Sequence, residues 1–352
     1  METALTPEPA GLGLPVEIGR IDKELGRLWE SSADTKSRAS LINFVVHSNT
    51  AASLAADTEL ISEIAGSHAC RAILILANPS ARESSARAWI NAHCHPAGKN
   101  GREICSEQIT FLLDGETATA LPNIVFSHLD SDLPLCLWWK GDLPEPLDEK
   151  LWAWVDRLIY DSSGWSRPVH QFSIVRHLSA SDIAGAVLCD LNWTRLHAWR
   201  YALASLFDHA AAFPRLSQVS SIEIQGGPGS HTAALLMLGW FADRLGWNID
   251  PQNGTLHSAA GREILFDHSK NGGLGISRVS IACDGARFDM ELPEDSDFFE
   301  ATIHAPGIPD THQLFPAPKS GLANTILAEL SRAGRHPLYI KSLEKILPLL
   351  KS

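Results

Sequence analysis

The spacing of hydrophobic residues changes several times along the first half of the chain. Ile18, Ile21, Leu25 and Leu28 recur every three or four residues with charged residues between them, which predicts an amphipathic helix over 16–29. Apolar runs that end at turn-forming residues predict strands at 41–46, 71–77, 88–93, 104–113, 135–139 and 158–160. Helical spacing separates some of these strands, at 53–64 and from Asp148 onward. Because strands and helices alternate, we expect a partly parallel sheet covered by helices.

The second half continues the alternation after a turn-rich stretch at 161–168. A long helical pattern covers 181–209, with Leu188, Leu191, Trp199, Leu203 and Leu206 on one side. A strand at 221–225 precedes a helix at 233–245, and further helices are expected at 320–333 and 340–350. We therefore predict an α/β fold with two domains, each a mixed sheet covered by helices. The expected parts are a leader with the first helix at 1–35, an N-terminal domain at 36–165 and a C-terminal domain at 166–352.

A β-hairpin is the sharpest local prediction. Apolar residues alternate with others over 279–283 and again over 288–292, and Asp284-Gly285 lies between these segments. An Asp-Gly pair suits a tight type I′ turn, whose two central residues have positive φ. We expect the two segments to pair in an antiparallel manner across this turn.

Charge and composition narrow the class of protein. The chain has 352 residues and 41 acidic against 29 basic ones, a formal charge of −12 that disfavours nucleic acid as a partner. No apolar run approaches the length of a membrane helix, and the N-terminal residues lack a basic segment followed by an apolar one, so we expect a cytoplasmic protein without a membrane partner. The six cysteines show no CxxC pair, and we expect all of them to be unpaired thiols.

Two segments could carry ligand chemistry, and each has a simpler explanation. His93 and His95 could point to one side of a strand and bind a metal in a hydrolase, with Cys105 as a nearby third ligand. No fourth ligand can be named. We therefore predict no metal and treat these histidines as solvated residues at a strand edge. Gly227 and Gly229 precede a helix and could cradle a phosphate. Pro228 removes a backbone donor and the third glycine of a dinucleotide motif is missing, so a structural turn is preferred and no cofactor is predicted.

The sequence contains no recognisable motif for a catalytic nucleophile and no pair of carboxylates that can be argued to act as acid and base, so we predict no catalytic residues. Aromatic and arginine side chains, which are enriched in interface hot spots, cluster in the long helical segment. Trp193 and Arg195 lie off its apolar stripe and are candidate partner contacts, whereas Trp199 lies on the stripe. Trp138 and Trp139 are further candidates, because consecutive strand residues face opposite sides and one ring could be exposed.

Several segments resemble the OpcA family in the family's order: GREICSEQIT at 101–110, LPLCLWWKGD at 133–142, VDRLIYDSS at 155–163, DLNWTRLHAWRYALASLFD at 190–208 and LGWFADRLGW at 238–247. The resemblance implies a two-domain, non-catalytic protein that promotes the oligomeric assembly and activity of glucose-6-phosphate dehydrogenase, and so NADPH production in the oxidative pentose phosphate pathway. An alternative is an enzyme or sensor that binds a nucleotide or sugar phosphate at the glycine-rich loop before His231.

Overall fold

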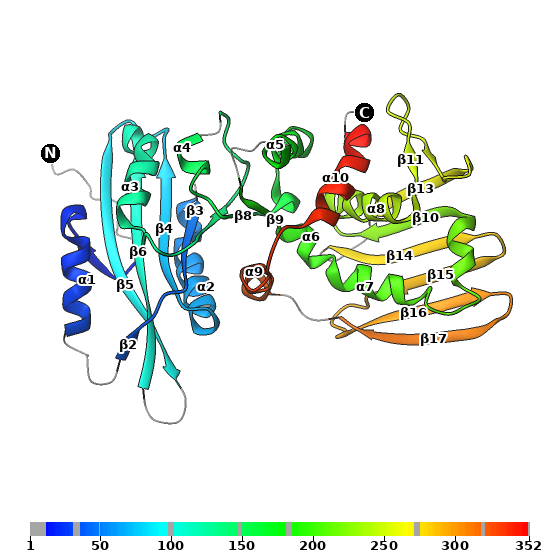
Figure 1. The fold of residues 1–352 in the computed structure, drawn as a ribbon, viewed down its shortest axis with the longest axis horizontal. Coiled ribbons are helices and arrows are strands. Elements are labelled where there is room, and N and C mark those ends of the chain that lie inside the picture. Colours follow the sequence, from blue (N-terminus) through cyan, green and yellow to red (C-terminus); the bar gives the residue numbers. More distant parts are fainter. Residues whose placement is uncertain are drawn as a thin grey trace. The chain divides into compact units, whose positions relative to one another are not determined.

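A computed structural model describes residues 12–30, 36–48, 50–97, 102–146, 149–180, 185–270, 275–317 and 321–350. The fold is α/β with two mixed sheets covered by helices, as predicted (Figure 1). The chain forms two compact units. The first comprises 1–160, 181–188 and 322–333, and the second comprises 161–180, 189–321 and 334–352. Each unit is therefore built from three separate segments of the chain. The contiguous domain bounds 36–165 and 166–352 stay a prediction.

The first sheet combines parallel and antiparallel strands. Its strands are β1 (Leu14–Val16), β2 (Lys36–Arg38), β3 (Ile42–Ser48), β4 (Cys70–Asn78), β5 (Ser85–Ala97), β6 (Arg102–Asp114), β7 (Leu135–Trp139), β8 (Arg157–Tyr160) and β9 (Val187–Asp190). Their order is β1-β5-β6-β4-β3-β7-β8-β9, and β2 pairs with β6. The pairs β6–β4, β4–β3, β3–β7 and β7–β8 are parallel, whereas β5–β6 is a long antiparallel pair.

The central strands of this sheet are buried on both faces. Every residue of β3 and of β7 is buried, as is every residue of β4 except Asn78. Such strands are typical of sheets with helices on both sides and appear in sequence as unbroken apolar runs. The helices of the first unit are α1 (Ile21–Glu30), α2 (Leu54–Ser67), α3 (Leu121–His128), α4 (Glu149–Trp152) and α9 (Leu322–Leu330). The predicted amphipathic helix is confirmed in α1, where Ile21 and Leu25 are buried.

The second sheet is mostly antiparallel. It contains β10 (Val219–Gly226), β11 (Asn248–Ile249), β12 (Leu256–His257), β13 (Glu263–Lys270), β14 (Ile276–Cys283), β15 (Ala286–Glu291), β16 (Phe298–Ala305) and β17 (Ile308–Pro316). The order is β11-β12-β13-β10-β14-β15-β16-β17, and only the β10–β13 pair of these neighbours is parallel. The predicted hairpin is confirmed, because Cys283 pairs with Ala286 across Asp284-Gly285. The turn is not of type I′, because φ is positive at Gly285 (68°) but not at Asp284.

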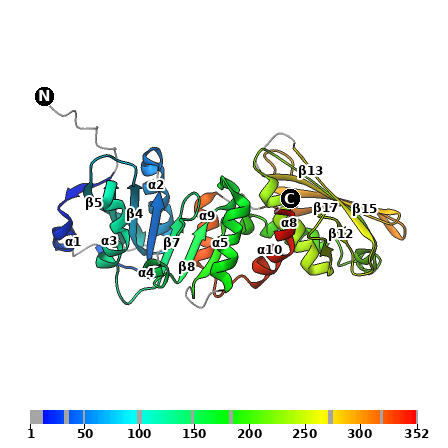
Figure 2. The ribbon, with the colours of Figure 1, turned by 90° about the horizontal axis from the view of Figure 1, so that it is seen from above.

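Helices cover one face of the second sheet. The helices of this unit are α5 (Pro168–Ala180), α6 (Leu191–Arg195), α7 (His197–Ser205), α8 (His231–Leu245) and α10 (Pro337–Leu350). Figure 2 views this sheet obliquely, with α8 and α10 on one side of it. The Trp199 ring of α7 contacts Phe299 of β16, with ring centroids 4.6 Å apart, and α10 packs along α8. Side chains from α7, α8 and the inner side of the sheet form the core of this unit.

The predicted long helix over 181–209 is wrong. Residues 185–209 of that range are described, and they form β9, then α6 and α7. A short apolar run such as Val187-Leu188-Cys189 cannot be assigned to helix or strand by periodicity alone. Asp190 then starts a new helix by accepting a hydrogen bond from the Asn192 N–H, as an N-cap does.

The prediction of six unpaired cysteines is also wrong, because Cys94 and Cys105 form a disulfide. They lie directly opposite each other in the β5–β6 pair, with Cα atoms 4.0 Å apart. Their pairing depends on strand register rather than on spacing in the sequence. Cys70, Cys136, Cys189 and Cys283 are free and buried. Among the described residues, none of the helices has both the length and the apolar character that crossing a membrane requires.

Candidate partner-contact site

The segment with Trp193 and Arg195 is fixed in place by two aspartates that cap short helices of the second unit. Asp190 Oδ1 accepts hydrogen bonds from the Asn192 N–H at 3.0 Å and from the Ser162 N–H at 3.1 Å. Asp161 starts the 3-10 helix at Ser162–Gly164 by accepting from the Ser163 N–H at 3.1 Å. Aspartate is a favoured N-cap because its carboxylate satisfies backbone N–H groups that the helix leaves unpaired. One carboxylate thus joins two elements that are about thirty residues apart in the chain.

Asp190 is a buried acid with an altered affinity for protons. Its exposed fraction is 1%, and burial raises its pKa from 3.8 to about 7, with a further increase from the negative charge of Asp161. Hydrogen bonds from Ser162 and Asn192 oppose this increase. Its second oxygen, Oδ2, lies 3.3 Å from the hydroxyl of Tyr339 on α10. Near neutral pH this group is therefore close to its midpoint of ionisation.

Asp161 pairs with Arg195 through two parallel hydrogen bonds. The guanidinium donates to Oδ1 at 3.0 Å and to Oδ2 at 2.7 Å. Burial would raise the pKa of Asp161, but the hydrogen bonds and positive charge of Arg195, with help from Ser163, lower it. The Arg195 side chain is 33% exposed. Arg195 is therefore oriented by a fixed partner and still reaches the surface, as an interface arginine does.

Trp193 is buried rather than exposed, which corrects the expectation that it lies off the apolar face. Its exposed fraction is 3%. The Arg200 guanidinium carbon lies 3.6 Å from the indole centroid, the Tyr339 ring lies 5.6 Å away, and Arg200 donates to the Trp193 carbonyl oxygen at 2.9 Å. The sequence misplaced Trp193 for two reasons. Tyr339, which covers its ring, is remote in the chain. The helix expected over 181–209 also starts too early, so the positions assigned to its apolar face were wrong. Trp193 packs against Arg200 and Tyr339 within the second unit, and a direct contact by its ring with a partner stays a prediction.

Trp138 and Trp139 are both buried, with exposed fractions of 3% and 9%. The expectation that one of these rings is exposed is therefore wrong. They point to opposite faces of β7, but β7 lies between β3 and β8 and both of its faces are covered. The Trp139 ring stacks on His47 at 3.7 Å, and its N–H donates to the Asp142 carbonyl oxygen at 2.9 Å. The Trp138 ring lies 5.2 Å from the Lys140 ammonium, and its burial, like that of Trp139, indicates a packing role in the first unit.

The glycine-rich loop makes contacts within the second unit. The Gly227 N–H donates to the Gly275 carbonyl oxygen at 2.8 Å, so this donor is already used, and Gly229 adopts a positive φ of 87°. Ser230 makes no helix cap, and its hydroxyl lies 2.9 Å from His268 Nε2. In a dinucleotide site, an acidic residue follows the second parallel strand and binds the ribose. Asp250 is the acidic residue at the matching distance here, but it follows β11, a two-residue strand that pairs antiparallel to β12. Phosphate binding at Gly227 and Gly229 stays an untested alternative.

His93 of β5 is buried rather than solvated as expected, and His95 is half-buried. His93 is 8% exposed, and its Nε2 atom lies 2.7 Å from Gln108 Oε1. Burial lowers the pKa of His93 below its ordinary value, which the Gln108 hydrogen bond partly offsets. The disulfide occupies the Cys105 sulfur, which was the nearest further metal ligand in the sequence. His93 therefore has a structural hydrogen bond inside the sheet.

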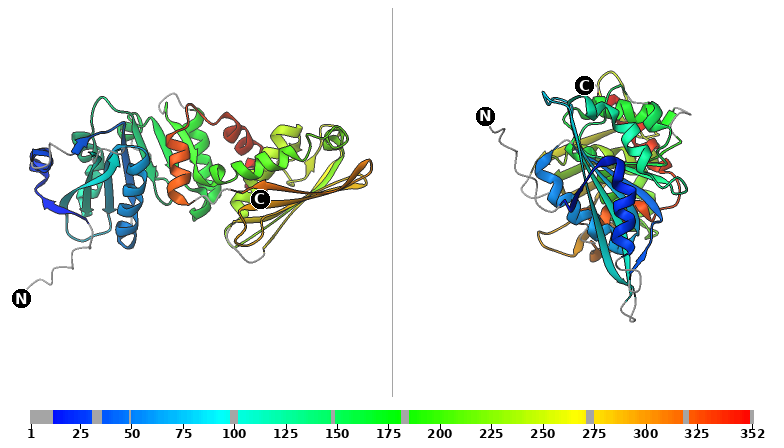
Figure 3. Two further views of the ribbon diagram at one scale, coloured as in Figure 1. Left: turned by 90° about the horizontal axis from the view of Figure 1, so that it is seen from below. Right: turned by 90° about the vertical axis from the view of Figure 1, so that its left-hand side faces the viewer.

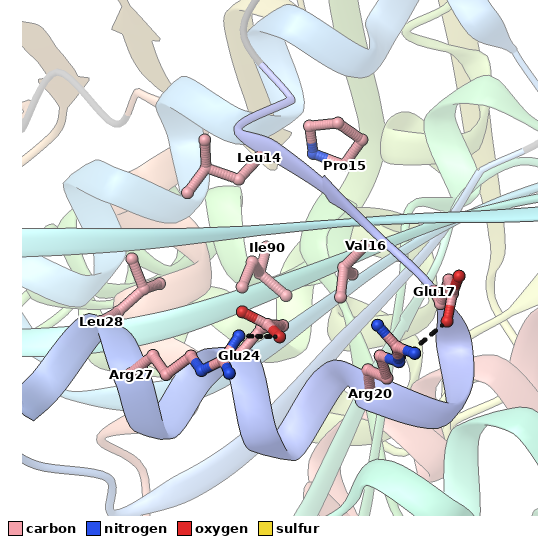
Figure 4. A pocket seen from close by; sticks show the side chains of 9 residues that line it. All are labelled: Leu14, Pro15, Val16, Glu17, Arg20, Glu24, Arg27, Leu28 and Ile90. Atoms are coloured by element: carbon pink, nitrogen blue, oxygen red, sulfur yellow. Dashed lines mark hydrogen bonds and ion pairs between the residues drawn. The ribbon is translucent and has the colours of Figure 1, made fainter.

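A surface groove beside α1 could not be foreseen from the sequence. Its volume is about 430 Å³, and it is lined by Leu14, Pro15, Val16, Glu17, Arg20, Glu24, Arg27, Leu28 and Ile90 (Figure 4). Arg20 pairs with Glu17 at 3.0 Å, and Arg27 pairs with Glu24 at 2.7 Å. Each guanidinium in the groove is thus paired with a carboxylate. The groove offers an apolar floor without an uncompensated charge that would select a ligand.

Comparison with known families identifies two consecutive matches. Residues 61–177 match a family model described as the glucose-6-phosphate dehydrogenase subunit N-terminal domain. Residues 186–343 match the corresponding model of the C-terminal domain. Together the two matches cover most of the chain and include the capping aspartate Asp190, Trp193 and Arg195.

Relatives and solved structures give further likenesses. A protein of Nostoc punctiforme named OxPP cycle protein OpcA is 34% identical over 196 residues, which are 53% of this chain and 40% of that protein. A protein of the same name from Synechocystis is 30% identical over 189 residues, 52% of this chain and 38% of that protein. The matched region thus spans about two fifths of these relatives.

Among solved structures, an aldose-aldose oxidoreductase from Caulobacter crescentus has a TM-score of 0.46 at 11% identity, covering 88% of this chain and 96% of that chain. The transcriptional regulator Gal80p of Kluyveromyces lactis has a TM-score of 0.48 at 10% identity, covering 89% and 92%. Likeness at this level carries no argument about activity.

Proposed function

The chain belongs to the OpcA family, and we propose that it is a non-catalytic assembly factor and allosteric activator of glucose-6-phosphate dehydrogenase. In this role it promotes the active oligomer of the enzyme in the oxidative pentose phosphate pathway. The observation that carries the proposal is the ordered match of 61–177 and 186–343 to the two domain models of a dehydrogenase subunit. A binding protein needs a fixed surface rather than a catalytic group, and the segment at 190–195 has that character.

The Asp161–Arg195 pair supports a contact role for Arg195. Two hydrogen bonds hold the guanidinium in one orientation, so little side-chain entropy remains to be lost when a partner binds. The buried Asp190 and Trp193 fix the short helix α6 that carries Arg195. A partner carboxylate or carbonyl group could bind the exposed edge of this guanidinium.

The proposal is tested with the dehydrogenase of the same organism. Size-exclusion chromatography with light scattering measures the mass of the enzyme alone and with this chain, and initial rates are measured over a range of enzyme concentrations. An assembly factor should shift the enzyme to a larger oligomer and raise its activity most at low enzyme concentration. An allosteric activator acting on a preformed oligomer should raise activity equally at all concentrations. Absence of both binding and activation in the wild-type chain would refute the proposed function.

Arg195 provides the residue-level test. Arg195→Ala should weaken binding by about 2 kcal/mol, roughly thirtyfold, with only a small change in melting temperature. Arg176→Ala is the matched control, because Arg176 is an exposed arginine on α5 of the same unit. Trp193→Ala should lower stability by about 3–5 kcal/mol, as expected for a buried aromatic residue. Unchanged binding by a folded Arg195→Ala protein would remove Arg195 from the contact.

A further inference from the structure

The second sheet has one face that no helix of its unit covers (Figure 3). Along β16 the burial alternates residue by residue, and β15 shows the same alternation. Phe299 of β16 contacts Trp199 of α7, and Phe288 of β15 contacts Phe207 just after α7, whereas the alternate residues point away from the helices. We call these alternate positions of β10 and β13–β17 the outer face; their described members include Glu223, Glu263, Leu265, Asp267, Arg278, Ser280, Arg287, Asp289, Glu291, Phe298, Glu300, Thr302, His312 and Leu314.

Two large apolar side chains lie close together on the outer face. Phe298 is 47% exposed and Leu314 is 59% exposed. Phe298 pairs with Pro316 and Glu300 pairs with Leu314, so Phe298 and Leu314 are diagonal neighbours on β16 and β17. Leu265, 65% exposed, lies apart from them on β13. An exposed aromatic and aliphatic pair on a mostly polar sheet face is typical of an interface anchor.

The outer face carries an excess of negative charge. Carboxylates on the outer face outnumber guanidiniums, which are those of Arg278 and Arg287. Both guanidiniums are bound within the face, because each pairs with Asp289, at 3.0 and 2.9 Å. Burial would raise the pKa of Asp289, but hydrogen bonds from Ser280 and the two arginines lower it. In the part of the chain that the structure describes, Glu263, Asp267 and Glu291 have no ion-pair partner, so the face presents unmatched negative charge.

Charge and area indicate what could cover this face. A second copy would bring unmatched carboxylates against unmatched carboxylates, and a phosphate backbone would be repelled in the same way. The complementary occupant is a protein surface rich in lysine and arginine. Six strands spaced by about 4.8 Å, each about eight residues long at ~3.3 Å per residue, present roughly 750 Å². That area is close to the ~800 Å² that each partner contributes to a standard protein interface.

We propose that the outer face, which carries the apolar pair Phe298 and Leu314 and an excess of carboxylates, binds a flat basic surface of the dehydrogenase. This inference rests on the proposed function, because it names the surface through which that binding occurs. Arg195 lies on α6 and is not part of the outer face, so the two contacts can be tested separately.

The test measures the affinity of the full chain for the cognate dehydrogenase by titration at low and at physiological salt. Two double variants probe the face: Glu291→Lys with Glu300→Lys, and Phe298→Ala with Leu314→Ala. The matched controls are Glu59→Lys with Glu63→Lys on α2, where both carboxylates are exposed, and Tyr201→Ala on α7, where the ring is 69% exposed. Circular dichroism and thermal melts establish that each protein folds.

Each face variant should bind at least tenfold more weakly, and the controls should bind like the wild type. The charge reversal should lose most at low salt, because screening at higher salt weakens the attraction in the wild type. Tight wild-type binding that both folded face variants retain would overturn the inference and leave the proposed function standing. Wild-type chain that does not bind would instead refute the proposed function. If the face variants disrupt only self-association, the face is an interface between copies and the inference is wrong.

Discussion

The two sheets contain similar strands in different surroundings. Ile73 and Leu74 are consecutive residues of β4, point to opposite faces of the first sheet, and are both fully buried. Phe298 and Phe299 are consecutive residues of β16 in the second sheet, and Phe299 is 2% exposed where Phe298 is 47% exposed. In a strand covered on both faces every side chain packs, whereas a strand covered on one face leaves alternate side chains available for binding. Groups for recognition are therefore expected on the second sheet rather than on the central strands of the first.

The largest expected effects separate Phe299 from Phe298. Phe299→Ala should reduce the free energy of unfolding by about 3–5 kcal/mol, because it removes a ring that contacts Trp199 and leaves a cavity. Phe298→Ala should change it by no more than about 0.5 kcal/mol, as exposed substitutions usually do. Urea unfolding followed by fluorescence or circular dichroism measures both values.

The first sheet supplies the matched pair for this prediction. Ile73→Ala and Leu74→Ala should each reduce the free energy of unfolding by about 2–5 kcal/mol, because both faces of β4 are covered. A large loss at one position and none at the other would show that β4 has an open face. A loss at Phe298 as large as that at Phe299 would show that the outer face is covered within the chain.

The same difference explains which elements could be predicted from the sequence. Strand β7 is an unbroken apolar run, and β3 and β4 are mostly apolar runs that contain Asn43 and Arg71. The β14–β15 hairpin appears as alternation around Asp284-Gly285, so the type of all these strands follows from local pattern. The strands β16 and β17 also alternate, but Phe298 and Leu314 interrupt the polar positions. These apolar residues on the outer face conceal the signal, and they are the residues to which we assign a binding role.

The candidate site was less predictable, because its geometry depends on residues far apart in the chain. Asp190 binds Ser162 and Tyr339, and Arg195 binds Asp161. Trp193 is buried by Arg200 and Tyr339. A helical wheel drawn over 181–209 could not place Trp193, because a strand occupies part of that range. The residue types of the segment could be identified from the sequence, but which of them reach the surface could not.

The two units also differ in how they hold a buried aspartate, and pH should reveal the difference. Asp57 of α2 in the first unit accepts hydrogen bonds from the Lys140 ammonium at 2.6 and 2.9 Å. Asp190 in the second unit accepts from the neutral groups of Ser162, Asn192 and Tyr339, and burial raises its pKa to about 7. Between pH 4 and pH 7 the folded chain therefore keeps Asp190 protonated while the unfolded chain ionises it. This group favours folding at low pH, and its contribution is lost as pH rises to about 7.

Asp190→Asn removes this pH dependence and keeps an oxygen to cap α6. Relative to the wild type, the variant should gain stability as pH rises from 4 to 8, by at most about 4 kcal/mol. Asp57→Asn is the contrasting variant and should lose about 1–3 kcal/mol at pH 7, because Lys140 is left without its carboxylate. Denaturant unfolding at several pH values measures both changes. A constant difference between wild type and Asp190→Asn over this range would show that Asp190 ionises normally.

The smallest expected effect concerns how neighbouring strands are connected. Parallel neighbours in the first sheet require crossovers, whereas β14 and β15 are joined by a two-residue turn in which Gly285 has a φ of 68°. A Cβ atom at Gly285 would have no atom within 4 Å, so Gly285→Val should destabilise through backbone strain rather than through a clash. We expect a loss of about 1–3 kcal/mol for Gly285→Val and a smaller loss for Gly285→Asn, because asparagine tolerates positive φ. Thermal melts and urea unfolding of both variants give the comparison. Equal losses would show that the conformation at Gly285 does not set the stability of this hairpin, and that pairing along β14 and β15 does.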